Sequence, residues 1–260
     1  MAQRMVVVTG GASGIGRAAV RLVGAAGVPV AVLDTDAAAA RAAAEEAVAA
    51  GAPDAAGLRC DVTDEGSVQG AVDAARERFG APPTGLVAAA GVDIGGPAHL
   101  LPVADWRRVL EVNLTGAYLA ARCVVAALLD SGAGGSLVLC SSPAASVAFA
   151  AGGTGAYAAS KGGVSALVRA LAVDYAAAGI RVNAIVPGPT ETALMWASVP
   201  EAERGAMRAT LCAEVPMGRL ADPEEPARAA LWLLGPDSSY VTGSHLVCDG
   251  GVLAKGSVSV

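Results

Sequence analysis

The sequence predicts an α/β fold, a doubly wound parallel sheet of about seven strands with helices on both faces. Short runs rich in β-branched residues alternate with longer Ala-rich stretches of helical pattern, and this alternation is typical of parallel strands joined by helical crossovers. The short runs are apolar throughout, as expected for strands buried on both faces. No linker or repeat divides the chain, so we expect a single domain over residues 1–260.

The expected strands are the seven β-branched runs, which in chain order are MVVVT (5–9), PVAVLD (29–34), AGLRCD (56–61), TGLVAAA (84–90), SLVLCS (136–141), IRVNAIV (180–186) and HLVCD (245–249). The expected helices are the Ala-rich stretches between them, near 14–26, 36–50, 64–79, 103–130, 157–178 and 223–234. The stretch near 190–218 breaks this alternation, which predicts an irregular or short-helical insert.

Composition and charge argue against several functions. The net charge of −6 and the lack of a basic run disfavour nucleic acid as a partner, because binding it requires a positive surface. Five scattered cysteines and two distant histidines predict no metal site, and such cysteines are typical of reduced thiols in a cytoplasmic protein. The uncharged stretch 131–160 is interrupted by Gly, Ser and Pro, so it predicts strand and loop rather than a membrane-spanning helix.

A glycine-rich loop joins the first expected strand to the first expected helix. It holds Gly10, Gly14 and Gly16, with Ser13 and Ile15 between them. A tight turn and a close approach to a diphosphate both require glycine, and a helix N-terminus supplies free N–H groups and a positive dipole. A glycine turn without a ligand is the alternative, but the strand before and the helix after favour a Rossmann-type dinucleotide site.

The identity of the dinucleotide depends on Asp34, which ends the second expected strand. An acidic side chain at this distance from the glycine loop meets the adenosine ribose hydroxyls, and its charge would repel a 2′-phosphate. The loop carries Ser13 rather than Arg or Lys, and Arg17 on the first helical turn is interpreted as solvated or ion-paired. We therefore expect NAD in preference to NADP.

Tyr157 and Lys161 lie four residues apart in the small-residue run GAYAASKGG (155–163), so on a helix they share a face. A free phenol has a pKa of ~10. A lysine cation ~5 Å away at an effective dielectric of ~20 favours the phenolate by roughly 3 kcal/mol, about two pKa units. The pair predicts a tyrosine suited to acid–base catalysis, although the spacing alone also fits an ordinary helix.

The glycine loop and the Tyr–Lys pair, in this order, resemble those of the classical short-chain dehydrogenases/reductases. Further segments extend the resemblance over essentially the whole chain: CDVTD (60–64), VNLTGAY (112–118), SLVLCSS (136–142), RVNAIVPGPTET (181–192) and DGG (249–251). The resemblance implies hydride transfer between a nicotinamide cofactor and an alcohol or ketone, with the protein supplying orientation and electrostatics.

The resemblance implies four catalytic residues. Tyr157 would exchange a proton with the substrate oxygen, and Lys161 would lower the pKa of Tyr157 and bind the nicotinamide ribose. Ser142 would orient the substrate oxygen. Asn113 would hold a water that links Lys161 to solvent, unless it only bridges backbone groups at a helix break.

The resemblance also implies cofactor contacts beyond the glycine loop and Asp34. These residues are Asp61, Val62, Ala90, Gly91, Tyr157, Lys161, Pro187, Gly188, Thr190 and Thr192. Asp61 would face the adenine, with Val62 close by. Thr192 would bond the carboxamide or phosphate, unless it is only a helix cap.

The sequence departs from the family pattern at two places. The family usually has N-N-A-G where residues 88–91 read AAAG, and each lost asparagine costs about 1 kcal/mol if its partners stay unmatched. The family serine commonly lies 13 residues before the tyrosine, where this chain has Ala144. Ser142 is preferred over Ser141 and Ser146 because it directly follows the expected strand, which places a two-residue insertion within 144–155.

Substrate and assembly are predicted only in outline. The insert near 190–218 is expected to form a lid over the substrate, with 93–95 and 143–149 as the other walls. No Arg or Lys is fixed in these opposing loops, and the lid arginines are interpreted as solvated, so a moderately apolar secondary alcohol or its ketone is expected. The apolar expected helices 103–130 and 157–178 predict a further partner, and the resemblance implies a homotetramer.

Two other functions stay open. An NADPH-dependent 3-oxoacyl reductase would share the fold, but Asp34 and Ser13 disfavour it. A non-catalytic dinucleotide-binding sensor or structural subunit is the alternative of another class; degenerate relatives usually lose the tyrosine or lysine, and this chain keeps both Tyr157 and Lys161.

Overall fold

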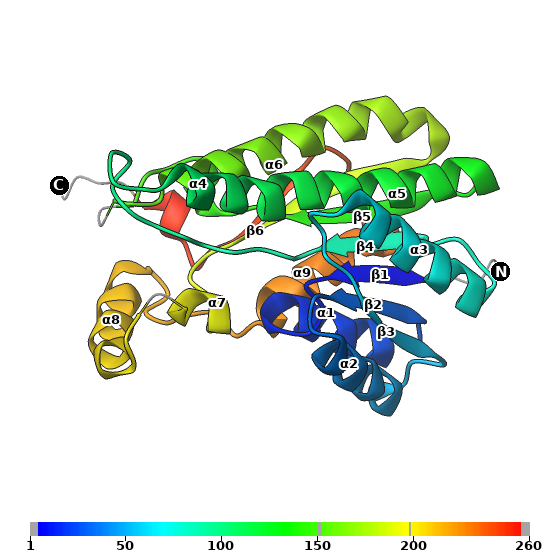
Figure 1. Cartoon of the computed structure of the whole chain (residues 1–260), viewed down its shortest axis with the longest axis horizontal. Coiled ribbons are helices and arrows are strands. Elements are labelled where there is room, and N and C mark those ends of the chain that lie inside the picture. The colour runs from blue at the N-terminus through cyan, green and yellow to red at the C-terminus, as the bar shows by residue number, and fades with distance from the viewer. Residues whose placement is uncertain (1–4, 150–151, 198, 256–260) are drawn as a thin grey trace.

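The computed structural model describes residues 5–149, 152–197 and 199–255. Its strands form a parallel seven-stranded sheet in the order β3-β2-β1-β4-β5-β6-β7, which confirms the predicted fold class (Figure 1). The strands are β1 (Val6–Thr9), β2 (Val30–Asp34), β3 (Ala55–Arg59), β4 (Gly85–Ala88), β5 (Gly135–Cys140), β6 (Ile180–Pro187) and β7 (His245–Cys248).

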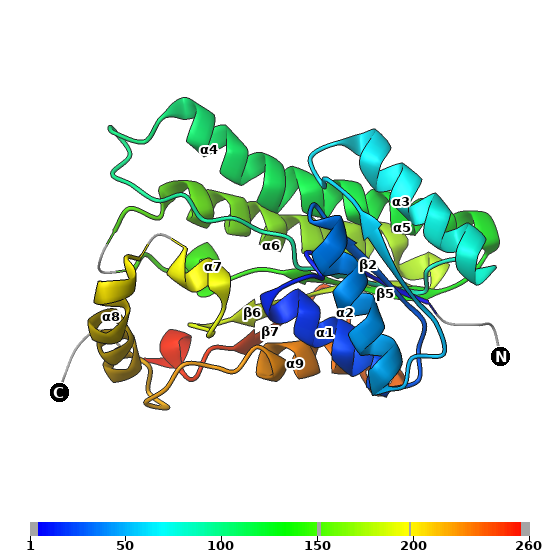
Figure 2. The same ribbon diagram turned by 60° about the horizontal axis from the view of Figure 1, so that its bottom comes forward.

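Helices cover both faces of the sheet (Figures 1 and 2). They are α1 (Gly14–Ala25), α2 (Ala37–Ala50), α3 (Glu65–Phe79), α4 (Val103–Leu110), α5 (Gly116–Ser131), α6 (Gly155–Tyr175), α7 (Ala193–Trp196), α8 (Glu201–Glu214) and α9 (Glu224–Leu234). Buried residues of α1, α2 and α9 form one hydrophobic cluster with the sheet, and those of α3, α5 and α6 form the other. The fully apolar strands are therefore explained by burial on both faces.

The chain reverses its direction of winding at β1, which pairs with β2 on one side and with β4 on the other. In open α/β sheets, ligands bind at such a switch point, outside the carboxyl ends of the strands. The topology therefore brings the loops after β1, β4, β5 and β6 to one edge of the sheet.

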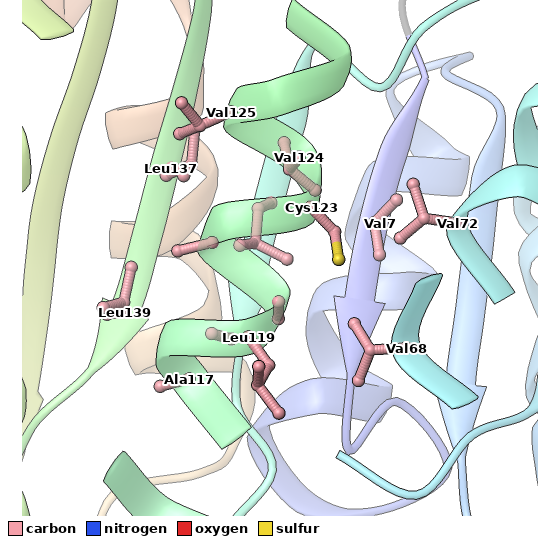
Figure 3. Close-up of a cluster of buried hydrophobic side chains, with 14 of the residues drawn as sticks. Val7, Val68, Val72, Ala117, Leu119, Cys123, Val124, Val125, Leu137 and Leu139 are labelled. Atoms are coloured by element: carbon pink, nitrogen blue, oxygen red, sulfur yellow. The ribbon is translucent and has the colours of Figure 1, made fainter. Parts of the chain in front are cut away.

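The core beneath this edge is built from small and medium-sized aliphatic side chains. Figure 3 shows α5 between β5 and the β1–α3 side of the molecule, with Leu119 and Val124 pointing into the cluster. Val124 and Leu137 are fully buried. Close packing of this kind fixes the position of α5, and with it the turn that precedes α5.

One expected helix, 103–130, differs in the structure. α4 and α5 are separated by a π-helical turn, Glu111–Thr115, which holds Asn113. Single π-helical turns inside longer helices often occur at functional sites. The reason for the break here is long-range, because the Asn113 amide is hydrogen-bonded to the backbone of Val92 after β4.

The combined helix Val103–Ser131 is the one segment of the described residues that is long and apolar enough to cross a membrane by length and composition. Its most apolar window has a mean hydropathy of 1.6, and 67% of that window is buried inside the protein. This burial is typical of a core helix.

The stretch near 190–218 holds the short helix α7, as expected, but also α8, which at 14 residues is as long as α2 and was not expected from the sequence. Figures 1 and 2 show α8 to one side of the sheet, beyond α7. No residue of α7 or α8 is buried among those described, so this insert packs more loosely than the core helices.

Candidate active site

The glycine loop after β1 has the geometry of a diphosphate cradle. Gly10 and Gly14 have φ angles of 64° and 50°, which L side chains rarely adopt. A Cβ on Gly16 would lie 2.2 Å from the Gly10 carbonyl oxygen, so only glycine fits there. Ser13 is the N-cap of α1 but its side chain makes no capping hydrogen bond, which leaves the first N–H groups of the helix to a ligand.

A hollow of about 400 Å³ opens beside this loop, lined by Gly14, Arg17 and Thr192 among others. A Cβ on Gly14 would lie 3.2 Å from Cγ2 of Thr192, so the loop after β6 closes over the glycine loop. The hollow also carries the charged side chains of Arg21, Glu46, Glu191, Asp222 and Glu224, so the fit to a diphosphate rests on the glycine loop and the free N–H groups at the start of α1. Ile15 points away from this hollow and packs partly buried against the core of α1, α2 and α9.

Asp34 lies at the carboxyl end of β2 and is tied to the glycine loop. One carboxylate oxygen accepts a hydrogen bond from the Ala12 N–H at 3.1 Å, and the other accepts one from the Asp36 N–H at 3.2 Å. Arg17 is paired with Glu46 through two hydrogen bonds, which confirms the ion-paired interpretation of this arginine. The acidic group of Asp34 therefore has no cation of the glycine loop beside it.

Asp61 and Val62 follow β3, but the Asp61 carboxylate is already engaged. It accepts hydrogen bonds from the backbone N–H and the hydroxyl of Thr63, and these bonds lower its pKa. Val62 is buried against Gly116, where a Cβ would come within 2.7 Å of it. Val62 thus links the loop after β3 to the start of α5.

The segments after β4 and β6 are close-packed backbone. A Cβ on Gly10 would lie 2.7 Å from the backbone of Ala90, so the glycine loop and the AAAG segment are in contact. Gly188, which follows Pro187, lies against Asp249 instead. A Cβ on Gly188 would lie 2.6 Å from the Cα of Asp249. The Thr190 hydroxyl donates to the Gly188 carbonyl at 2.9 Å.

Thr192 is a helix cap, which was the stated alternative to a cofactor contact. Its hydroxyl accepts a hydrogen bond from the Met195 N–H at 3.3 Å, at the start of α7. The capping geometry does not remove it from the hollow, where its methyl group faces Gly14.

Tyr157 and Lys161 lie on one face of α6, as predicted. Lys161 Nζ is 5.5 Å from the centre of the Tyr157 ring. Lys161 is buried, and its ammonium donates a hydrogen bond of 2.8 Å to the carbonyl of Cys140, the last residue of β5. This bond satisfies a buried cation and joins α6 to the end of the central sheet.

Ser142 lies close enough to Tyr157 to act on its phenol. Its hydroxyl interacts with the side chain of Tyr157 and lowers the pKa of that phenol, and it also accepts a bond from the Ala144 N–H. The neighbouring Ser141 points elsewhere, because its hydroxyl lies 2.7 Å from that of Ser165 and donates to the Lys161 carbonyl. The structure thus brings Ser142, and not Ser141, to Tyr157; Ala150 and Ala151 of the expected insertion lie outside the described residues.

The pKa of Tyr157 is shifted in the direction opposite to the sequence-based expectation. Although part of the ring keeps contact with solvent, burial of the phenol raises its pKa well above the usual range. Burial also lowers the pKa of Lys161. The charge attraction computed from spacing alone left out the cost of desolvating both groups, and here that cost is the larger effect.

Asn113 bridges backbone groups. Its amide oxygen accepts from the Val92 N–H at 2.8 Å, and its Nδ2 donates to the Val92 carbonyl at 2.9 Å and to the Ser160 hydroxyl at 3.1 Å. The side chain is therefore fully used in holding the loop after β4 against α6. This is the helix-break alternative that the sequence had left open.

Asp93 is one further residue of the site, and from the sequence it was expected only in a wall of the substrate site. Its Oδ1 atom is buried and finds no hydrogen-bond partner in the part of the chain that the structure describes, and its charge acts on both Tyr157 and Lys161. The signal in the sequence was weak, since an aspartate two residues after Gly91 reads as an ordinary loop residue.

The comparisons with known proteins agree with this site. Residues 10–253 match a family model described as enoyl-(acyl carrier protein) reductase. A cis-4-hydroxycyclohexanecarboxylate dehydrogenase from Sinomonas cyclohexanicum is 42% identical, with 97% of this chain and 98% of that protein covered. A 2,5-dichloro-2,5-cyclohexadiene-1,4-diol dehydrogenase from Sphingobium indicum is 36% identical, with 96% and 97% covered.

Among solved structures, a variant of actinorhodin polyketide ketoreductase with NADPH superposes with a TM-score of 0.89 at 32% identity, covering 97% of this chain and 99% of that one. The chain belongs to the classical short-chain dehydrogenase/reductase family. Its chemistry is the transfer of a hydride between a nicotinamide dinucleotide and a secondary alcohol or ketone.

The raised pKa of Tyr157 gives a direct test by ultraviolet titration. Subtracting the phenolate absorbance of Tyr157→Phe from that of the wild-type protein isolates this one phenol. We expect its ionisation midpoint to lie above the ordinary value of about 10, because burial disfavours the phenolate. The same subtraction with Tyr240→Phe, a fully exposed tyrosine, calibrates the absorbance change per tyrosine. A midpoint at or below about 10 for Tyr157 would contradict the burial argument.

Proposed function

We propose that this protein is an NAD-dependent dehydrogenase of a neutral cyclic secondary alcohol, with Tyr157 as its general acid and base. The observation that carries the proposal is the meeting of Ser142, Tyr157 and the buried Lys161 at the carboxyl end of β5. The two relatives whose names give ring alcohols as substrates support the cyclic class.

Each residue has a definite task in this proposal. The nicotinamide ring, when bound, accepts or supplies the hydride. The Ser142 hydroxyl holds the substrate oxygen beside the phenol. The Tyr157 hydroxyl gives its proton to a carbonyl oxygen in reduction, and in oxidation the Tyr157 phenolate takes the proton from the alcohol. Lys161, fixed by the Cys140 carbonyl, supplies a positive charge on the face of α6 that stabilises the phenolate.

The protonation state of Tyr157 sets the direction of the pH dependence. Burial keeps the phenol protonated at neutral pH in the ligand-free protein, which suits an acid. Oxidation requires the phenolate, so its rate rises with pH up to the pKa that Tyr157 has in the loaded enzyme.

The choice of NAD rests on Asp34 and Arg17. Asp34 ends β2 beside the glycine loop, and the guanidinium of Arg17 is held by Glu46. A 2′-phosphate would meet a carboxylate there instead of a free cation. The other implied contacts, Asp61, Val62, Ala90, Gly91, Pro187, Gly188, Thr190 and Thr192, border the same edge of the sheet and complete the proposed site.

The proposal extends to the localisation and the assembly of the protein. We infer a cytoplasmic homotetramer in which the insert of α7 and α8 covers the substrate. Large apolar side chains are exposed on two separate faces: Tyr118 and Val173 on α5 and α6, and Trp232, Tyr240 and Val247 around α9 and β7. Two self-complementary faces are what a tetramer with two-fold symmetry requires.

The cofactor proposal is tested by binding. We expect the wild-type protein to bind NADH at least about tenfold more tightly than NADPH, because Asp34 repels the extra phosphate. Asp34→Asn should narrow this preference by about tenfold while Asp36→Asn, a matched change at the N-cap of α2, leaves it unchanged. Titration by NADH and NADPH fluorescence measures both constants. Tighter NADPH binding by the wild type would reject NAD and favour the reductase alternative.

The role of Ser142 is tested against its neighbour. Ser142→Ala should lower kcat/KM for cyclohexanol and NAD by about 10²-fold, because the substrate oxygen loses its positioning donor. Ser141→Ala removes the contact with Ser165 and should cost about 1 kcal/mol of folding free energy, with kcat/KM nearly unchanged. Steady-state kinetics and chemical denaturation measure the two effects. The reverse pattern would assign the role to Ser141.

A further inference from the structure

The loop after β4 is held at both ends, and Asp93 lies between the two anchors. At Val92 the backbone N–H and carbonyl are both bonded to Asn113. At Gly96 the N–H donates to the Gly153 carbonyl at 2.7 Å, just before α6 begins. A loop fixed in this way holds its side chains in place, so Asp93 has a defined position beside the site.

The Asp93 carboxylate is an unused acceptor in that position. Its Oδ1 atom is buried and has no hydrogen-bond partner among the described residues. Burial raises its pKa, and the charge of Lys161 opposes this shift. The Lys161 ammonium donates to the Cys140 carbonyl, and among the described residues no hydrogen bond joins it to Oδ1 of Asp93.

A buried carboxylate oxygen without a donor is costly, and a bound molecule that brings a donor removes this cost. The reacting oxygen of the substrate already has Ser142 and Tyr157 as its partners in the proposed function. A second hydroxyl on the substrate would supply Asp93 with a donor.

We propose that Asp93 is a specificity-determining residue, which accepts a hydrogen bond from a second hydroxyl of the substrate, so that the substrate class is a neutral ring diol. This inference rests on the proposed function and narrows it.

The same geometry disfavours a substrate that carries a carboxylate. Asp93 places a like charge in the site, and the lid arginines are in use. Arg204 donates to the carbonyls of Val199 and Trp196, and Arg208 is paired with Glu191. The chain should thus differ in substrate from its 42% identical relative, whose name gives a hydroxycarboxylate.

The test measures kcat/KM with NAD for three kinds of probe: cyclohexanol, the 1,2- and 1,4-cyclohexanediols, and cis-4-hydroxycyclohexanecarboxylate. The wild-type protein is compared with Asp93→Leu, which removes the acceptor, and with Asp93→Asn, which keeps the shape and one acceptor oxygen. NADH binding by each variant shows whether the fold and the cofactor site are intact.

We expect the wild type to oxidise its best diol at least about tenfold more efficiently than cyclohexanol, since a hydrogen bond to a charged group contributes that much. In Asp93→Leu this ratio should fall to about one, and Asp93→Asn should lie between. The ratio is the readout, because loss of the Asp93 charge also acts on the pKa of Tyr157 and so changes the oxidation of both substrates together. Both variants should gain in relative activity on the hydroxycarboxylate.

Two results overturn the proposal. The first is that the wild type oxidises cyclohexanol without preferring a diol, or that the diol preference is unchanged in both variants while they bind NADH. Either outcome would remove the role of Asp93 and leave the proposed function standing. No turnover of any ring alcohol by a wild-type protein that binds NADH would remove the proposed function, and this inference with it.

Discussion

The hydrogen bond from the buried ammonium of Lys161 to the Cys140 carbonyl is the contact on which the site depends. It joins α6 to the last residue of β5, an interior strand of the sheet that pairs with β4 and β6. Tyr157 lies one helical turn before Lys161, and Ser142 lies two residues after Cys140. This bond of 2.8 Å, with the contacts of Ser141 to the Lys161 carbonyl and to Ser165, holds the phenol, the serine hydroxyl and the cation near one another.

This arrangement costs free energy, because Tyr157 and Lys161 are both desolvated. Burial raises the pKa of Tyr157 and lowers that of Lys161, so both groups favour their neutral forms more than they do in water. The Asp93 carboxylate adds a negative charge that also opposes the phenolate. The surroundings of the two groups therefore determine their pKa values. The Tyr157–Lys161 charge pair counted in isolation gives the wrong sign for the pKa shift of Tyr157.

Much of the fold was predictable from the sequence because its signals are local. The runs from MVVVT to HLVCD coincide with β1 to β7 to within a few residues, since apolar β-branched runs between helices have few other solutions. A helix break at Asn113 was one of two alternatives from the sequence, but the partner of Asn113 was not predictable. Asn113 contacts Val92, 21 residues away, and no local pattern encodes that contact.

The candidate site likewise has parts that were predictable from the sequence and parts that were not. The glycine loop, Asp34 and the Tyr157–Lys161 face follow from motifs and helical spacing. Ser142 was preferred over Ser141 for its position after the strand, and the structure adds the contacts of the two hydroxyls. The pKa of Tyr157, by contrast, needed its burial. Asp93 needed the two anchors of its loop, which come from segments distant in sequence.

The most direct test of the account is the NAD-dependent oxidation of cyclohexanol by Tyr157→Phe, with NADH binding measured on the same preparation. The account predicts that kcat falls by about 10²- to 10⁴-fold while NADH binds as tightly as before, because only the proton-transfer group is lost. Tyr240→Phe, at an exposed site, should match the wild type. Full turnover by Tyr157→Phe would contradict the central claim.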